Sequence, residues 1–178
     1  MAIEDFKGVQ VLDLFHNGDA RGSFTKIYNR DNLERFGIHT RIEESYYSVS
    51  QKDVIRGMHF QLPPHEHEKI VHVLRGEIVD VILDLRKGSE TYGKCFSIRL
   101  CGEEAKALYI PCGFAHGFRT LCDDTLMLYY VSSGYAPQSD TGIRWDSIGY
   151  DWNTKTPILS ERDQTFVKFA DFQSPFYL

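Results

Sequence analysis

The stretch KIVHVLRGEIVDVILDL, residues 69–85, holds two runs rich in valine, isoleucine and leucine on either side of Arg75-Gly76. Apolar and polar residues alternate through much of both runs, and β-branched side chains pack well on a pleated surface. Both runs are therefore typical of β-strands. The Arg75-Gly76 pair between them is typical of a tight turn, so we predict a hairpin at this point.

Similar runs continue in both directions along the chain. They predict strands at residues 9–14, 23–28, 42–50, 54–60, 69–74, 77–85, 92–100, 105–110 and 126–132. The run around His116 reads as a strand as well. Helix is sparse, with one short segment expected at 31–37 and another within the aperiodic region 134–156. Many short strands with a few short helices favour one all-β domain over residues 1–178, a jelly-roll sandwich or barrel whose mouth can hold a small ligand.

Bulk composition narrows the function. The net charge of −5 and the lack of any block of basic residues exclude nucleic acid as the main ligand. No apolar run reaches the roughly 20 residues that cross a bilayer, and the first residues lack the features of a signal peptide. The four cysteines show no CxxC spacing, which favours reduced thiols over zinc ligands or disulfides. We therefore expect a cytoplasmic protein with no membrane partner.

Several ionisable side chains fall inside the predicted strands. Arg56 and His59 share one strand, Lys69 begins the next, and His116 lies in a later apolar run. A strand packed against a core gains nothing from such residues, because burying a charge is costly. A pocket that binds an anion and moves protons needs them. The simpler alternatives are a solvated edge for Arg56 and Lys69 and a hydrogen-bonded core position for His59.

The orientation of Arg56 and His59 depends on Gly57. Strict alternation along a strand puts residues three apart on opposite faces of a sheet. A bulge at Gly57 would turn both side chains to the same side. We predict such a bulge, with both side chains directed into the cavity.

Three further features suggest proton transfer or anion binding. Tyr129 and Tyr130 are adjacent on one strand and must face opposite ways, so only one can enter a cavity as a proton donor; core packing is the alternative for either. Arg21 stands beside a glycine in a turn, where a guanidinium can bind a phosphate. Arg162 lies in a segment that reads first as a helix N-cap or a charged loop.

The His65-x-His67 pair raises the question of a metal. Together with His116 it resembles the metal motifs of cupins, and a metal cupin oxygenase using these three and His72 is a competing hypothesis. The position where a metal cupin carries a glutamate ligand holds Lys69, whose charge repels a divalent cation. Both histidines of the pair follow two prolines, so we expect them in a surface loop and assign no metal and no cofactor.

In chain order, these segments resemble the dTDP-4-dehydrorhamnose 3,5-epimerase family, a group of cupin-type jelly-roll enzymes. The resemblance covers nearly the whole chain. It rests on DARGSF (19–24), VIRGMHFQ (54–61), EKIVHVLRGEIVDVILDLRKGSETYG (68–93), YIPCGFAHGF (109–118), LYYVSSGYAP (128–137), GIRWD (142–146) and ILSERD (158–163).

The resemblance implies a homodimeric, cofactor-free epimerase that inverts carbon 3, carbon 5 or both in a nucleoside-diphosphate-linked 4-keto-6-deoxyhexose. It assigns His59 as the general base and Asp163 as the residue that orients it. Tyr129 is then the acid on the opposite face of the sugar, and Lys69 is the cation beside the enolate oxygen. The substrate-binding positions that it implies are Arg21, Phe24, Arg56, Gln61, His116 and Arg162.

The chain departs from the family pattern in three places. Lys26 stands where an acidic residue that contacts the nucleoside is usual, Tyr46 stands where asparagine is common, and the 62–68 loop is unusual. The nucleotide is therefore open between thymidine, cytidine and guanosine diphosphates. A single-centre epimerase acting on a CDP- or GDP-linked sugar is an alternative function, and a catalytically silent sugar-nucleotide binding module is another.

Overall fold

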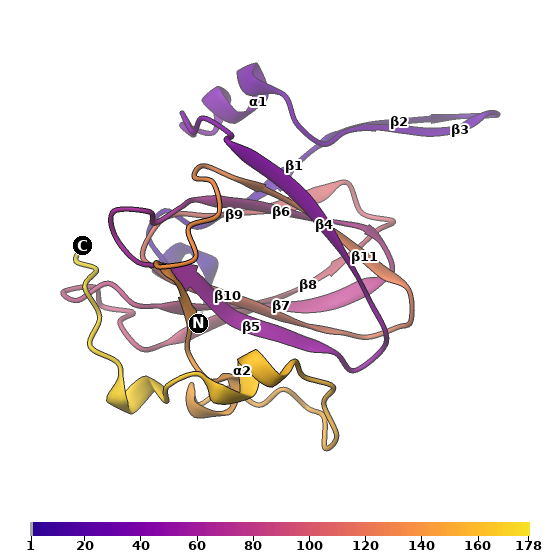
Figure 1. The fold of residues 1–178 in the computed structure, drawn as a ribbon. Helices are drawn as coiled ribbons and strands as arrows, with labels where there is room; N and C mark the ends of the chain where they lie inside the picture. Colours follow the sequence, from indigo (N-terminus) through magenta and orange to yellow (C-terminus); the bar gives the residue numbers. More distant parts are fainter. Residues whose placement is uncertain (1) are drawn as a thin grey trace.

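The computed structural model describes residues 2–178 as two antiparallel five-stranded sheets that face each other (Figure 1). One sheet has the order β1 (Gln10–Asp13), β9 (Lys106–Ile110), β6 (Lys69–Arg75), β11 (Thr125–Val131) and β4 (Glu44–Ser50). The other has the order β12 (Asp140–Gly142), β5 (Ile55–Gln61), β10 (Phe114–Thr120), β7 (Glu77–Asp84) and β8 (Cys95–Cys101). The predicted all-β sandwich is confirmed.

Short segments complete the fold. A separate two-stranded hairpin projects from the body of the molecule (Figure 1) and consists of β2 (Phe15–Asp19) and β3 (Gly22–Lys26). The helical segments are η1 (Ile3–Asp5), α1 (Arg30–Arg35), η2 (Trp145–Ser147), α2 (Glu161–Thr165) and η3 (Phe169–Asp171). Within residues 2–178, no helix has the length and apolar character needed to cross a membrane.

Each predicted strand range overlaps a strand of the structure, but two features differ. The sequence does not predict β2 or β12, because β2 is exposed along its whole length and β12 has only three residues. The predicted hairpin at Arg75-Gly76 is wrong, since β6 and β7 belong to opposite sheets and the turn carries the chain across the sandwich. Gly76 has a φ of 83° there, and a side chain would collide with Thr125.

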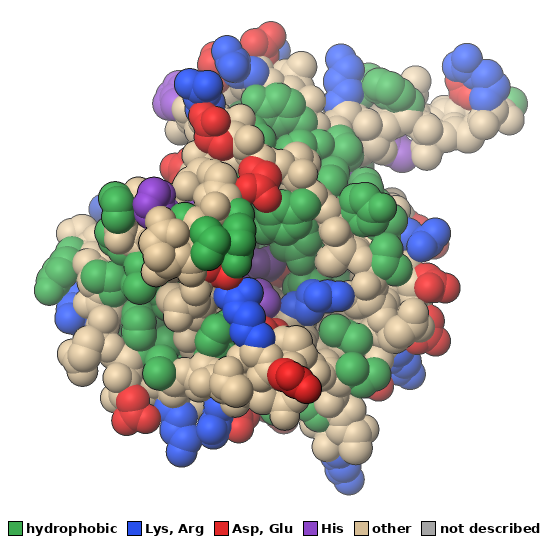
Figure 2. Space-filling view, viewed as in Figure 1, with side chains coloured by type: hydrophobic (Ala, Val, Ile, Leu, Met, Phe, Trp, Pro, Cys, Tyr) green, Lys and Arg blue, Asp and Glu red, His purple; other side chains and the backbone are tan. Residues whose placement is uncertain are grey.

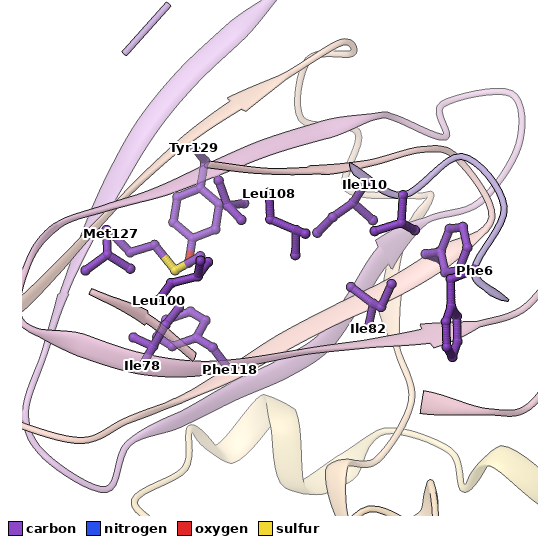
Figure 3. Close-up of a cluster of buried hydrophobic side chains, with 13 residues drawn as sticks. Phe6, Ile78, Ile82, Leu100, Leu108, Ile110, Phe118, Met127 and Tyr129 are labelled. Carbon is purple, nitrogen blue, oxygen red and sulfur yellow. The ribbon is translucent and has the colours of Figure 1, made fainter. Parts of the chain in front are cut away.

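Apolar side chains from the two sheets meet between them (Figure 3). The facing sets come from β7 and β10 and from β9 and β11, and they include Ile78, Ile82, Phe118, Leu108, Ile110, Met127 and Tyr129. Full burial of a side chain of this kind stabilises the fold by ~1.5–3 kcal/mol. Phe118 and Tyr129 also line the cavity described below, so the packing of the core fixes one of its walls.

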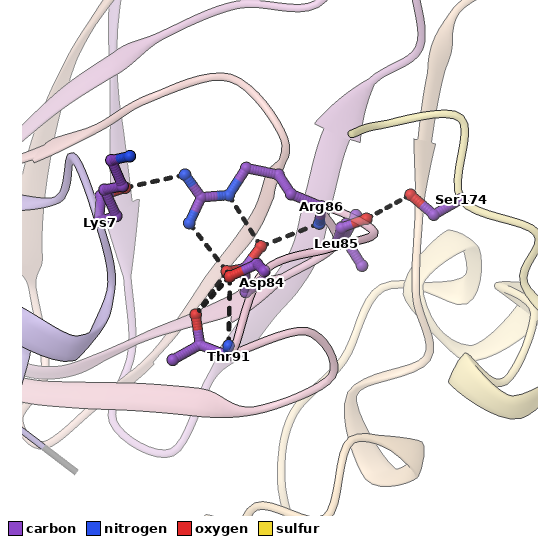
Figure 4. Close-up of polar contacts among 7 residues, drawn as sticks. Lys7, Asp84, Leu85, Arg86, Thr91 and Ser174 are labelled. Atoms are coloured by element: carbon purple, nitrogen blue, oxygen red, sulfur yellow. Dashed lines mark hydrogen bonds and ion pairs between the residues drawn. The ribbon is translucent and has the colours of Figure 1, made fainter. Parts of the chain in front are cut away.

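A buried ion pair fastens the loop that follows β7 (Figure 4). The Asp84 carboxylate accepts hydrogen bonds from Nε and Nη2 of Arg86 at 2.9 and 2.8 Å and from the Thr91 hydroxyl at 2.6 Å. Arg86 also donates to the Lys7 carbonyl at 2.8 Å. Burial raises the pKa of Asp84, but these hydrogen bonds outweigh it and hold the pKa below its usual range. The pair is therefore ionised, and it ties the N-terminal segment to the sandwich.

Arg86→Leu would remove the cation and leave Asp84 buried and charged. We expect the free energy of unfolding to fall by about 3–5 kcal/mol, measured by urea denaturation. Adding Asp84→Asn removes the orphaned charge and should recover part of the loss. The matched control, Arg41→Leu, breaks an exposed pair with Glu43 and should have little effect. A loss below about 1 kcal/mol for Arg86→Leu would contradict this interpretation.

Candidate active site

A cavity of about 360 Å³ opens between the two sheets, within the size range of small-ligand sites. Figure 2 looks into this hollow, where histidine side chains lie at the bottom and basic side chains lie beside them. Strands β5 and β10 form one side, and β6 and β11 form the other. The residues singled out by sequence that line it are Arg56, His59, Gln61, Lys69, His116, Tyr129 and Arg162.

A bulge at Gly57 turns Arg56 and His59 toward this cavity. His59 pairs with His116 of β10, and Arg56 pairs with Phe118. The two residues between Arg56 and His59 on β5 therefore oppose a single residue of β10. Gly57 has a φ of 147°, and a side chain there would lie 2.6 Å from the backbone of β10. Only glycine fits this position. The predicted bulge is confirmed.

His59 is held by a buried carboxylate. Its Nε2 lies 2.8 Å from Oδ1 of Asp163, whose other oxygen accepts a hydrogen bond from the Gly57 amide at 3.1 Å. Burial raises the pKa of Asp163, but the hydrogen bonds from His59 and Gly57 hold it below its usual range. An ionised carboxylate can only accept. Nε2 of His59 therefore carries the proton, and Nδ1 is left free as a base.

The charge state of His59 suits this role. Burial lowers the pKa of its imidazole and outweighs Asp163, which raises it, while the cations Lys69 and Arg162 lower it further. The imidazole is therefore neutral at pH 7. Its side chain is 31% exposed, so a molecule in the cavity can reach it. A neutral imidazole oriented by a carboxylate can act as a general base.

Tyr129 enters the cavity from the sheet opposite β5. Its ring is 7% exposed, stacks on the ring of Tyr46 with centroids 4.7 Å apart, and meets the His116 ring nearly at right angles. Burial raises the pKa of its phenol above the usual value, so the group is protonated at neutral pH and can donate a proton. Tyr130 packs against Tyr28 on the other face of the sheet.

Lys69 lies buried beside the base. Its side chain crosses the cavity, where Nζ donates to the His59 carbonyl at 3.1 Å, and the residue is 6% exposed. The alternative of a solvated Lys69 is therefore wrong. Burial lowers the pKa of this lysine to about 8, although Asp140 and Asp80 raise it. The ammonium group persists at pH 7, and in this poorly solvated site it can stabilise a negative oxygen strongly.

Gln61 uses its amide within the protein. Its Oε1 accepts from the Ala136 amide at 2.7 Å, and its Nε2 donates to the His65 carbonyl at 2.7 Å and to Nδ1 of His67 at 3.1 Å. It thereby holds the loop that precedes β6. His65 and His67 lie in a loop, as predicted. The prediction that both lie at the surface is wrong for His67, which lines the cavity. Burial is the main cause that lowers the pKa of His67 to about 3, so this ring is neutral.

Of the four histidines of the competing metal hypothesis, His67 and His116 line the cavity, but the other two do not. His72 is three residues from Lys69 on β6, so the alternation of a strand places it on the other face of the sheet. Its Nδ1 lies 2.6 Å from the Lys106 carbonyl. His65 does not line the cavity, and its Nε2 lies 3.4 Å from Nε2 of Gln138. Across residues 2–178, no group of three or more His, Cys, Asp or Glu side chains is arranged to hold a metal ion.

Of the residues expected to bind substrate, two arginines lie at the cavity and two other residues lie elsewhere. Arg162 forms an ion pair with Asp140 at 2.6 Å, and Arg56 lines the wall beside His59. Arg21 and Phe24 do not line this cavity. Both are on the projecting β2–β3 hairpin, where the Phe24 ring is 57% exposed.

Sequence reasoning missed several residues of the wall. Tyr135 is 65% exposed and lines the cavity. Its aromatic side chain, in the loop that follows a predicted strand, is the feature of the sequence that could have indicated a binding residue. Asp140 and Glu44 gave no signal, because their place depends on contacts with distant segments. The contact of Tyr46 with Tyr129 depends on the pairing of two strands, which one sequence does not reveal.

Comparisons with known proteins agree with this geometry. A sequence model of dTDP-4-dehydrorhamnose 3,5-epimerase matches residues 4–171. The dTDP-4-dehydrorhamnose 3,5-epimerase of Methanothermobacter thermautotrophicus is 39% identical over 165 residues, which are 90% of this chain and 88% of that protein. This chain belongs to the dTDP-4-dehydrorhamnose 3,5-epimerase family.

Two further members of the family are informative. A dTDP-6-deoxy-D-glucose-3,5-epimerase of Legionella pneumophila, solved with dTDP-4-keto-L-rhamnose, superimposes with a TM-score of 0.90 at 32% identity and covers 96% of this chain and 94% of its own. A dTDP-4-dehydrorhamnose 3-epimerase of Streptomyces niveus is 35% identical over 168 residues, which are 93% of this chain and 81% of that protein. The resemblance and the cupin-type jelly roll that it implies are confirmed.

The lowered pKa of Lys69 can be measured without substrate. In this member of the family, the Lys69 side chain should titrate with a midpoint near pH 8, whereas lysines in water titrate near 10.4. NMR of protein labelled in the lysine side chains follows the titration, and Lys69→Met assigns the signal by removing it. A midpoint above about 10 would show that the ammonium is solvated.

Proposed function

We propose that this chain is a single-domain, cofactor-free epimerase that inverts carbons beside the ketone of a dTDP-linked 4-keto-6-deoxyhexose. The observation that carries the proposal is the placement of a neutral imidazole, His59, and a protonated phenol, Tyr129, on opposite sheets of one cavity. Lys69 lies buried between the sheets beside the base. The names of the relatives support the same reaction.

The proposed reaction needs two groups and one cation. Nδ1 of His59 removes a proton from a carbon next to the ketone, and the electron pair moves into a new C=C bond while the ketone oxygen becomes an enolate. The Lys69 ammonium stabilises that oxygen. As the enolate collapses, Tyr129 delivers a proton to the other face of the carbon, which inverts it. Solvent then takes the proton from His59 and returns one to the phenolate. The ketone itself stores the charge, so the reaction needs no cofactor.

The nucleotide part of the substrate serves to position the sugar. The exposed Tyr135 ring at the cavity offers a surface on which a base can stack. Arg56 and Arg162 supply positive charge at the same site for the pyrophosphate. Binding energy from these remote groups fixes the sugar between His59 and Tyr129.

The number of inverted carbons is a second question, because carbons 3 and 5 both flank the same ketone. The Streptomyces niveus relative is named a 3-epimerase, at 35% identity. A single-centre reaction would use the same base, acid and cation. The test of function therefore has to follow the two carbons separately, and it includes CDP- and GDP-linked sugars.

The homodimer is also part of the proposal. The Phe15 and Phe24 rings lie 6.4 Å apart on the projecting hairpin, and each is more than half exposed. Exposed aromatic pairs on an arm favour burial against a second chain. Arg21 and Phe24 are substrate-binding positions by resemblance to the family, yet they lie outside the cavity of their own chain. A two-fold dimer would let each arm reach the cavity of its partner.

The proposed compartment is the cytoplasm. All four cysteines are free. Burial raises the pKa of Cys95 and of Cys112 to about 12, with nearby carboxylates adding to the effect at Cys112, which makes these thiols unreactive. Free thiols support a reducing compartment.

With dTDP-4-keto-6-deoxyglucose in D2O, the wild-type protein should incorporate deuterium at carbon 3, carbon 5 or both, as followed by NMR. His59→Asn should slow this exchange by about 10²–10⁴-fold because the base is lost. His39→Asn makes the same change at an exposed position and should leave the rate unchanged.

The positions labelled distinguish the candidates. Deuterium at carbon 3 alone or carbon 5 alone would favour a single-centre epimerase. A lack of exchange in the wild type with dTDP-, CDP- and GDP-linked keto sugars would refute the proposed function and favour a silent binding module.

Mixed dimers test the shared cavity. Co-expression of Arg21→Ala and His59→Asn chains should restore activity to about a quarter of the wild-type level, since half of random dimers are mixed and one of their two cavities is intact. Each variant alone should be strongly impaired. If Arg21→Ala is fully active alone, or if the mixture is no better than the separate variants, the arm does not serve the partner's cavity.

A further inference from the structure

The ring of Tyr46 covers one face of Tyr129. The two residues stand directly opposite each other on β4 and β11. Their ring centroids are 4.7 Å apart, with an angle of 21° between the planes. Tyr46 is 41% exposed and Tyr129 is 7% exposed, so the outer ring shields the inner one. Both rings line the cavity.

Tyr129 also contacts a second ring, which is itself fixed. The His116 ring lies 6.4 Å from that of Tyr129 at 71°, and Nε2 of His116 is held 2.8 Å from the carboxylate of Asp80, which is fully buried. Tyr129 thus contacts both an anchored imidazole and the Tyr46 ring. The Tyr46 contact comes from β4, the edge strand of the sheet, and Ser48 of the same strand also lines the cavity.

The contact of Tyr46 with Tyr129 does not involve its hydroxyl. Within the described residues no hydrogen bond joins the two phenols, and the rings meet as a stack. Stacked aromatic pairs stabilise the position of both rings beyond the effect of the area that they bury.

We propose that Tyr46 is a positioning residue that holds the Tyr129 ring where its hydroxyl meets the sugar face opposite His59. The proposal rests on the proposed epimerase function. It adds that Tyr46 decides how the enolate is quenched. With Tyr129 in place, the enolate takes its new proton from the phenol and the carbon inverts. With Tyr129 displaced, the His59 imidazolium exchanges its proton with solvent and then returns the solvent-derived hydrogen to the original face, so the carbon exchanges its hydrogen without inversion.

The experiment measures both outcomes in D2O. NMR compares deuterium in recovered, uninverted substrate with deuterium in inverted product, for Tyr46→Phe and Tyr46→Leu. Tyr46→Phe keeps the stack and should match the wild type. Tyr46→Leu keeps an apolar side chain but loses the stack, and the ratio of inversion to exchange should fall by about 3- to 10-fold while exchange and dTDP affinity persist. Tyr129→Phe gives the limiting case, exchange without inversion.

Several results would overturn the proposal. If Tyr46→Leu lowers exchange and inversion by the same factor, Tyr46 supports the site as a whole. If only KM rises, Tyr46 contacts the substrate. If Tyr46→Phe behaves like Tyr46→Leu, the hydroxyl and not the ring is what matters. Tyr46→Ala repeats the test if the leucine variant does not fold. Failure of the proposed function is recognised separately, because the wild type would then exchange no hydrogen.

Discussion

The hydrogen bond between His59 and Asp163 joins the two parts of the chain on which the site depends. It links β5 to helix α2 across 104 positions of sequence. The carboxylate is 4% exposed, and it also accepts from the amide of Gly57 at the bulge that turns Arg56 toward the cavity. One buried carboxylate therefore sets the tautomer of His59, the direction of its ring and the local backbone of the strand that carries it.

Burial sets the charge states of the cavity before any substrate arrives. It lowers the pKa of His59, raises that of Tyr129 and lowers that of Lys69 to about 8. The His59 imidazole is therefore unprotonated, the Tyr129 phenol is protonated, and the Lys69 ammonium is poorly solvated enough to interact strongly with an anion. The same three residues in water would have a partly protonated imidazole and a well-hydrated ammonium. The sandwich thus supplies the charge states that the proposed reaction needs as well as the geometry.

Local patterns in the sequence predicted most of the sandwich, because β-branched alternation and turn residues are properties of short segments. They also placed His59, Lys69 and His116 in strands and predicted the bulge at Gly57. They could not show that the chain crosses between sheets at Gly76, since the same turn residues serve hairpins and crossings alike. Contacts between side chains of neighbouring strands, such as the stacking of Tyr46 on Tyr129, depend on a pairing register that no local pattern encodes.

The role of Asp163 came from the resemblance to a family and not from its own segment, which reads as a helix N-cap. That reading is also correct, since the Ser160 hydroxyl accepts from the Asp163 amide at 3.0 Å. The helix start presents the carboxylate to a strand that is distant in sequence. His67 was misplaced for a related reason: its inward orientation depends on Gln61, whose amide holds the loop.

The most direct test is a crystal structure with an unreactive substrate analogue, a dTDP-linked 6-deoxyhexose that has a hydroxyl in place of the ketone. The mechanism predicts one pyranose ring between the two sheets, with Nδ1 of His59 and the Tyr129 hydroxyl about 3–3.5 Å from opposite faces of the same carbon. The Lys69 ammonium should lie beside the oxygen on carbon 4. A sugar bound with both groups on one face, or outside the reach of either, would contradict the mechanism.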